Sequence, residues 1–243
     1  IGDYSVRITN NFGDSINSAT ATLIISDVQS SLWKGLVGYY TFDEDARDLS
    51  LFANHGTVYG AKKATGRGNS GGAYEFDGVD DYIDAGNLIR KFDVCSFGFW
   101  FQTENLSLKP ETFIQKRREP NGGGVQIGNL FQNVGVAYSV NRDEWGDPQR
   151  IVESADTGLI GKWNYVLCSS SGQEMSLYIN GVLIGKSQMP ATAALSDEPL
   201  WFGRGFANSP DSYGVRAFNG FLDNIRIYNR ALSATEASEL YLS

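Results

Sequence analysis

The chain has 243 residues, of which 42% are hydrophobic and 20% are charged, and its formal net charge is −8. A chain this acidic repels phosphate groups, which argues against a nucleic-acid or anionic-membrane partner. No apolar run approaches the roughly 18 residues that a membrane-spanning helix needs, so no membrane insertion is expected. The single histidine, His55, removes most histidine-based catalysis and histidine-rich zinc sites.

The first 27 residues read as two strands joined by a turn at residues 10–13 (NNFG). Tyr4, followed by the alternating Val6 and Ile8, resembles the corner tyrosine and penultimate strand of an immunoglobulin-like domain. That resemblance implies the last hairpin of an upstream domain over residues 1–27, with residues 28–35 as a linker. The alternative is that the hairpin adds two edge strands to the main body.

From residue 36 onward, β-branched and aromatic runs separated by glycine or polar breaks predict short strands. In VCSFGFWFQ (94–102), Cys95, Phe97, Phe99 and Phe101 share one face. Trp100 lies on the other face between small residues, and reads either as a core side chain or as an exposed platform. Within SLYINGVLIG (176–185), the Asn-Gly pair between apolar runs predicts a hairpin with a type I′ turn.

The end of the chain predicts a short helix, because Ser233 and Glu236 form a capping box ahead of apolar residues at helical spacing. Cys95 and Cys168 each lie in a strand-like run. They are two buried thiols or, if their strands are neighbours, a disulfide.

Five ordered motifs then carry a family resemblance: GLVGYYTFDE (35–44), DLSLFANHGTV (48–58), AYEFDGVDDYID (73–84), WNYVLCSSSGQEMSLYINGVLIG (163–185) and FNGFLDNIRIYNRALSATE (218–236). Together they resemble laminin-G-like modules of the concanavalin A-like lectin/glucanase superfamily. The resemblance implies an all-β fold over residues 36–243, a two-sheet antiparallel jelly-roll sandwich with a short C-terminal helix.

Catalysis is the weakest interpretation. Glycosidases of this fold resemble one another in an E-x-D-x-E strand, and the sequence has no such pattern. The Q-[IV]-H strand of alginate-type lyases is also missing, because glycine follows Gln126 and Ile127. His55 stands in a turn-like ANHGT segment, where a structural role is expected.

The aspartates of FDGVDDYID (76–84) predict either calcium binding or turns, since calcium takes six to eight oxygen ligands and aspartate also favours Asx turns. The family resemblance implies a structural calcium where the opening strand, the loop after it and the closing strand meet. It assigns the ligands Asp43, Asn54, Asp77, Asp80 and Asp223, with Asp48 in reserve.

Three long polar segments, residues 115–124, 141–150 and 203–216, are the expected ligand-binding loops. Their arginines suit carboxylate or sulfate, which predicts an anionic polysaccharide. The alternative is that these arginines pair with acids in their own loops. The candidate contacts are Lys116, Arg117, Arg142, Trp145, Arg204, Tyr213 and Arg216.

The sequence therefore predicts a non-catalytic carbohydrate-binding module of a larger secreted bacterial protein, extracellular or at the cell surface, with a polysaccharide or glycan as partner. An adhesion module that binds a protein partner is the alternative, and a glycosidase or polysaccharide lyase is the third reading.

Overall fold

A computed structural model describes residues 2–5, 7–9, 14–17, 21–23, 31–69, 71–104, 106, 110–117, 124–129, 134–141, 150–155, 158–189, 196–205 and 216–243. The chain divides into two compact units, residues 1–35 and 36–243. Within the described ranges, no helix has the length and apolar character needed to cross a bilayer.

The first unit contains two antiparallel strand pairs. Strand β1 (Gly2–Tyr4) pairs with β4 (Ala21–Leu23), and β2 (Arg7–Thr9) pairs with β3 (Ser15–Asn17). The pairing brings the described residues of the two predicted strands together, although the expected turn lies outside the described residues. The immunoglobulin-like assignment of this hairpin stays a prediction.

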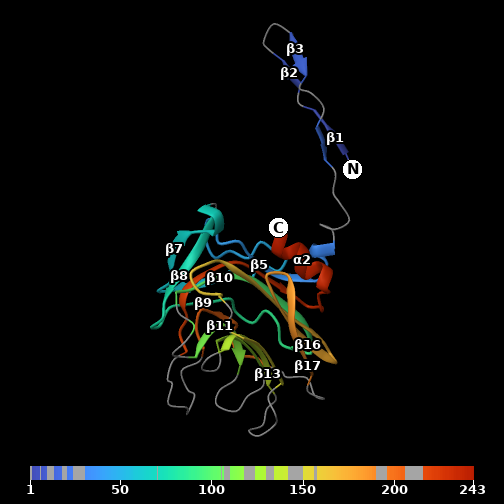
Figure 1. The fold of residues 1–243 in the computed structure, drawn as a ribbon. Helices are drawn as coiled ribbons and strands as arrows, with labels where there is room; N and C mark the ends of the chain where they lie inside the picture. The colour runs from blue at the N-terminus through green and yellow to red at the C-terminus, as the bar shows by residue number, and fades with distance from the viewer. Residues whose placement is uncertain are drawn as a thin grey trace. The chain divides into compact units, whose positions relative to one another are not determined.

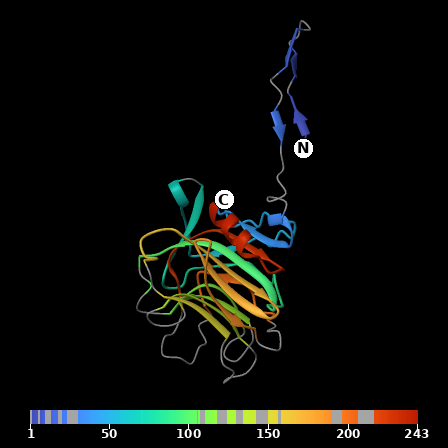
Figure 2. The same cartoon turned by 45° about the vertical axis from the view of Figure 1, so that its right-hand side comes forward.

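The second unit is a sandwich of two antiparallel sheets, which lie one above the other in Figures 1 and 2. Among the described residues, the first sheet has eight strands: β5 (Leu36–Tyr40), β7 (Lys62–Thr65), β8 (Gly72–Asp77), β10 (Val94–Gln102), β15 (Asn164–Ser171), β16 (Glu174–Ile179), β17 (Val182–Gln188) and β19 (Asn219–Tyr228). A 3₁₀ turn, η1 (Arg67–Asn69), follows β7.

The second sheet has seven strands within the same described ranges, in the order β14-β13-β12-β11-β18-β9-β6. Their bounds are β6 (Thr57–Tyr59), β9 (Tyr82–Asp84), β11 (Glu111–Arg117), β12 (Gly124–Asn129), β13 (Val134–Asn141), β14 (Arg150–Ala155) and β18 (Trp201–Phe202). The two sheets confirm the predicted all-β sandwich.

Apolar side chains that alternate along the strands close the space between the sheets. Phe97, Phe99 and Phe101 of β10 are fully buried. Phe101 stacks on Phe113 of the facing sheet with ring centroids 4.8 Å apart. The face predicted from the period of two is therefore the core face. Cys95 lies on it as well, and both cysteines are buried free thiols.

The predicted hairpin joins β16 to β17. Asn180 and Gly181 have φ angles of 52° and 78°, the left-handed values that a type I′ turn requires. The Asn180 side chain accepts a hydrogen bond from the Tyr165 amide at 2.8 Å, which fastens the turn to β15.

Helix α2 (Ala234–Leu242) begins at the predicted capping box, with both reciprocal hydrogen bonds between Ser233 and Glu236 formed. The helix lies beside the eight-stranded sheet (Figure 1), where Tyr241 packs against Trp100 with centroids 5.6 Å apart. Arg67 covers Trp100 at 4.1 Å, so only 4% of this tryptophan is exposed. Trp100 is thus a structural side chain.

Asp48 holds the loop that follows β5. Its buried carboxylate accepts hydrogen bonds from the amides of Tyr39, Ser50 and Asn54 and from the Ser50 hydroxyl, at 2.8–2.9 Å. The Asp48 amide donates to His55 Nδ1 at 3.2 Å. His55 therefore has the structural contact expected of it.

Replacing Asp48→Ala should lower the free energy of unfolding by about 3 kcal/mol, because buried amide donors lose a charged acceptor. Urea denaturation followed by circular dichroism measures this change. Asp45→Ala, which removes an exposed carboxylate from the same loop, is the matched control and should leave the midpoint unchanged. Equal midpoints for the two variants would contradict the role of Asp48.

Candidate functional site

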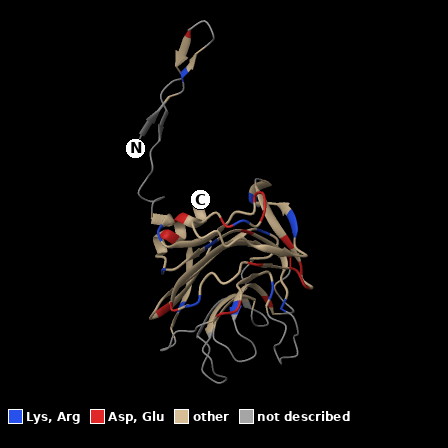
Figure 3. Cartoon of the chain, turned by 180° about the vertical axis from the view of Figure 1, so that it is seen from behind, with Lys and Arg blue, Asp and Glu red and all other residues tan. Residues whose placement is uncertain are grey.

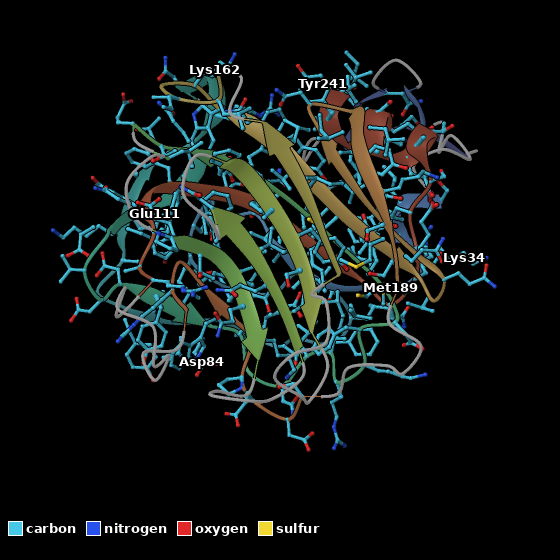
Figure 4. The ribbon with its side chains drawn as sticks, turned by 60° about the horizontal axis from the view of Figure 1, so that its bottom comes forward. Lys34, Asp84, Glu111, Lys162, Met189 and Tyr241 are labelled. Atoms are coloured by element: carbon cyan, nitrogen blue, oxygen red, sulfur yellow. The ribbon has the colours of Figure 1, made fainter. Side chains whose placement is uncertain are left out.

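Three aromatic side chains form a row on the outer face of the seven-stranded sheet. They are Tyr59 of β6, Tyr82 of β9 and Trp201 of β18. Their chain neighbours Ile83 and Phe202 are fully buried in the core. Because side chains alternate along a strand, Tyr82 and Trp201 point to the other side. Figure 4 looks onto this sheet, with Asp84 at the end of β9 labelled.

The three rings stand side by side. Tyr59 and Tyr82 are cross-strand partners, and their rings stack with centroids 4.5 Å apart and planes 11° apart. Tyr82 and Trp201 are also 4.5 Å apart, at 37°. The faces between the rings are therefore occupied. The surface left for a ligand consists of the ring edges and the outer face of Tyr59, which is 46% exposed at the sheet edge.

Two amide side chains continue the row. Gln115 of β11 lies opposite Trp201, and Gln126 of β12 lies opposite Gln115. Gln126 donates to the Thr112 hydroxyl at 3.0 Å. Gln115 is 1% exposed, and its Nε2 has no hydrogen-bond partner among the described residues. A buried donor without a partner is costly, so an acceptor from water or from a ligand fits this position.

Arg204 lies beside the row. The Arg204 guanidinium lies 5.5 Å from the centre of the Tyr82 ring and donates to the Asp80 carbonyl at 3.2 Å. The Arg216 carbonyl accepts hydrogen bonds from Thr112 and Gly205. A Cβ on Gly205 would come within 2.8 Å of Gln115 Oε1, so a larger residue here would displace the Gln115 amide.

Charges of both signs are mixed along the described ribbon (Figure 3). On the outer face, Asp84 accepts a hydrogen bond from the Gly86 amide at 2.8 Å. Burial raises the pKa of Tyr82, and Tyr59 raises it further. The Tyr82 phenol is thus a neutral hydroxyl at neutral pH. The row offers stacking surface, phenol hydroxyl groups, and a guanidinium at its side.

The structure places the predicted ligand contacts unevenly. Arg204 lies beside the aromatic row, and the Arg216 backbone is hydrogen-bonded to Thr112 and Gly205. The backbone of Arg117 belongs to β11, but its side chain is outside the described part, as are Arg142, Trp145 and Tyr213. Lys116 needs a correction. It lies in β11 rather than in a loop, and its side chain is fully buried, so it cannot contact a ligand from the surface.

The structure separates the predicted calcium ligands into three groups. The Asn54 amide donates a hydrogen bond to the Asp48 carboxylate, so Asn54 lies in the loop that follows β5. Asp43 adjoins Asp223, whose pKa burial raises to about 6. At Asp43, the Lys63 ammonium already contacts the carbonyl oxygens of Phe42 and Asp43. Among the described acidic residues, Asp43 and Asp223 are not part of the cluster whose ligand atoms lie within 4.8 Å of one another.

The third group is the turn between β8 and β9, which we call the acidic turn: Asp77, Asp80 and Asp81. Their ligand atoms lie within 4.8 Å of one another. Asp77 and Asp81 also accept amide hydrogen bonds inside the turn. Carboxylate oxygens are the ligands that calcium prefers, so this donor set fits the ion. Calcium stays a prediction.

Sequence reasoning missed Tyr59, Tyr82, Trp201 and Gln115. A signal for two of them was present, because Val58-Tyr59 and Tyr82-Ile83 each place a tyrosine next to a core residue. Which strands lie side by side was not visible, since β6, β9 and β18 are distant in sequence.

Solved structures with the same fold include domain 4 of AbnA, a GH43 extracellular arabinanase from Geobacillus stearothermophilus, in complex with arabinotriose. Its TM-score is 0.66 at 18% identity, over 85% of this chain and 98% of that one. The botulinum neurotoxin serotype D binding domain in complex with N-acetylneuraminic acid has a TM-score of 0.66 at 16% identity, over 88% of this chain and 52% of that one. The binding domain of Paraclostridial Mosquitocidal Protein 1 has a TM-score of 0.65 at 18% identity, over 86% and 52%. This chain thus spans about half of the two toxin domains.

No curated protein matches the sequence. A laminin-G-type family model, described as the concanavalin A-like lectin/glucanases superfamily, matches residues 77–238. That range holds most of both sheets and two of the three aromatic residues of the row, and the chain belongs to this superfamily.

Proposed function

We propose that this domain is a non-catalytic carbohydrate-binding module that holds a polysaccharide on the outer face of its seven-stranded sheet. The observation that carries the proposal is the row of Tyr59, Tyr82 and Trp201 on the outer face of the sheet. Sugars present apolar C–H faces beside hydroxyl groups, so a surface of ring edges beside tyrosine hydroxyls and a guanidinium is complementary to them.

Related structures support a sugar ligand. The arabinanase domain was solved with arabinotriose and the toxin domain with N-acetylneuraminic acid. The comparison with the arabinanase domain carries more weight, because this chain covers nearly all of it. Attachment to a larger secreted protein, as the sequence predicts, belongs to the same proposal.

The domain binds its ligand without cleaving it. A retaining glycosidase needs two carboxyl groups about 5 Å apart over the substrate. On the outer face, Asp84 lies opposite Trp201 and Thr57, which are not acids. Release of reducing sugar by the purified domain, lost in Asp84→Asn, would overturn this part of the proposal.

Tyr59→Ala and Trp201→Ala should each weaken polysaccharide binding at least tenfold, because each removes stacking surface from the row. Affinity electrophoresis and calorimetry with arabinan and polygalacturonate measure the change. Phe52→Ala removes an equally exposed aromatic ring, 59% against 46% for Tyr59, from a different loop. This control should bind normally. Unchanged binding by both row variants with native circular dichroism would contradict the site. Binding to a protein but to no glycan would favour the adhesion alternative.

Arg204 beside the row carries a positive charge, so the proposed ligand is an acidic polysaccharide. Arg204→Gln should weaken binding to polygalacturonate several-fold and flatten its salt dependence, while binding to neutral arabinan changes little. Arg47→Gln is the matched control, since Arg47 is paired with acids on an exposed loop. An equal loss for acidic and neutral polymers would assign Arg204 a structural role instead.

Calcium at the acidic turn would hold the start of β9, where Tyr82 is the first residue of the strand. Saturating calcium at about 100 times its Kd should therefore raise the free energy of unfolding by about 2.7 kcal/mol relative to EDTA. Thermal unfolding with calcium or EDTA measures the response. Asp80→Asn should abolish it, and Asp43→Asn should keep it. The absence of any response, or its survival in Asp80→Asn, would contradict calcium at this turn.

A further inference from the structure

Lys116 is a lysine inside a β-sandwich. It lies in β11 opposite Val125 of β12, a fully buried core residue, and its own side chain is 0% exposed. Removing an ammonium group from water costs several kcal/mol unless hydrogen bonds compensate for the loss. A buried ammonium group therefore needs hydrogen-bond partners, and Lys116 has two.

The ammonium joins two segments that are distant in sequence. It donates to the side-chain oxygen of Asn87, just after β9, and to the carbonyl of Glu198, just before β18. The same segments exchange backbone hydrogen bonds, from Ala85 to the Leu200 carbonyl and from Leu200 to the Gly86 carbonyl, both at 2.8 Å. Lys116 thus adds a charged contact, which we call the tether, between two segments that backbone hydrogen bonds already join.

These segments lead directly into the candidate site. Asp84 and Tyr82 precede the first segment, and Trp201 follows the second. Strand β18 has only two residues, so its own ladder offers little to fix the angle of Trp201. The contacts that fix residues 196–200 therefore also fix the position of the Trp201 ring relative to Tyr82.

We propose that Lys116 is a positioning residue for the glycan-binding face, which it acts on from the core by tying residues 85–87 to residues 196–200. The role in binding rests on the function proposed above, whereas the tether stands on the contacts alone.

The proton on Lys116 makes the tether sensitive to pH. Burial, helped by Arg90, lowers its pKa to about 8 against the opposing effect of Asp197, Glu198 and Asp84. Asp197 is paired with Arg90 at 2.5 Å. Above the folded pKa, the charge-assisted hydrogen bonds become weaker neutral ones. Because the pKa of Lys116 in the unfolded chain is higher, near 10.5, this group does not lower global stability as pH rises from 8 to 10.5. Loss of the proton weakens the two hydrogen bonds but removes the larger cost of a buried charge, so the contribution of Lys116 to folding improves.

Hydrogen exchange tests the tether without a glycan. In Lys116→Met, which keeps an unbranched chain in the core, peptides covering residues 82–88 and 196–203 should exchange about tenfold faster, while the rest of the sandwich is unchanged. Lys63→Met is the matched control, because Lys63 also bonds two backbone carbonyls but lies on β7 of the other sheet. In the unmodified protein, protection of the two segments should rise as pH passes 8, after correction for intrinsic rates, because opening releases Lys116 to water, where its pKa is higher. In Lys116→Met it should not.

Glycan affinity is the second readout. Lys116→Met should bind polysaccharide about tenfold more weakly at pH 7 with an unchanged unfolding midpoint, and Lys63→Met should bind normally. Unchanged exchange in residues 82–88 and 196–203 overturns the tether. Faster exchange with unchanged affinity overturns the positioning role. If the unmodified domain binds no glycan, the function proposed above fails and the positioning role with it, while the exchange result still decides the tether.

Discussion

The alternation of side chains along paired strands is the constraint on which the rest of this structure depends. Burying the phenylalanine row of β10 against Phe113 and its neighbours turns alternate residues inward, except where a register shift intervenes, as between Thr112 and Ile114 of β11. The residues between them must then face outward. Tyr82 and Trp201 stand on the outer face because Ile83 and Phe202 occupy the core. The side chains of the candidate site thus lie on the outer face of the same strands whose inner face forms the core.

Sequence patterns were sufficient wherever the determining contacts are local. The β10 face follows from a period of two, the turn at Asn180 and Gly181 from its demand for positive φ, and helix α2 from its capping box. Each signal lies within about ten residues of chain. The immunoglobulin-like origin of the first hairpin has no such local test.

The site was harder to predict because strand order creates it. Tyr59, Tyr82, Trp201 and Gln115 become neighbours only when β6, β9, β18 and β11 pair. The same limit explains Lys116, which stands beside Arg117 and Arg118 in a basic run but faces the core once its register against Val125 is fixed.

The central claim is that a polysaccharide binds to the outer face of the seven-stranded sheet. Amide chemical-shift mapping tests it most directly, by titrating isotope-labelled domain with oligosaccharides of the best-bound polymer. The account predicts that shifts concentrate in residues 57–59, 82–84, 115–117 and 201–204. Shifts confined to the groove lined by Val37, Phe52 and Val94, or to helix α2 and the sheet beside it, would contradict it.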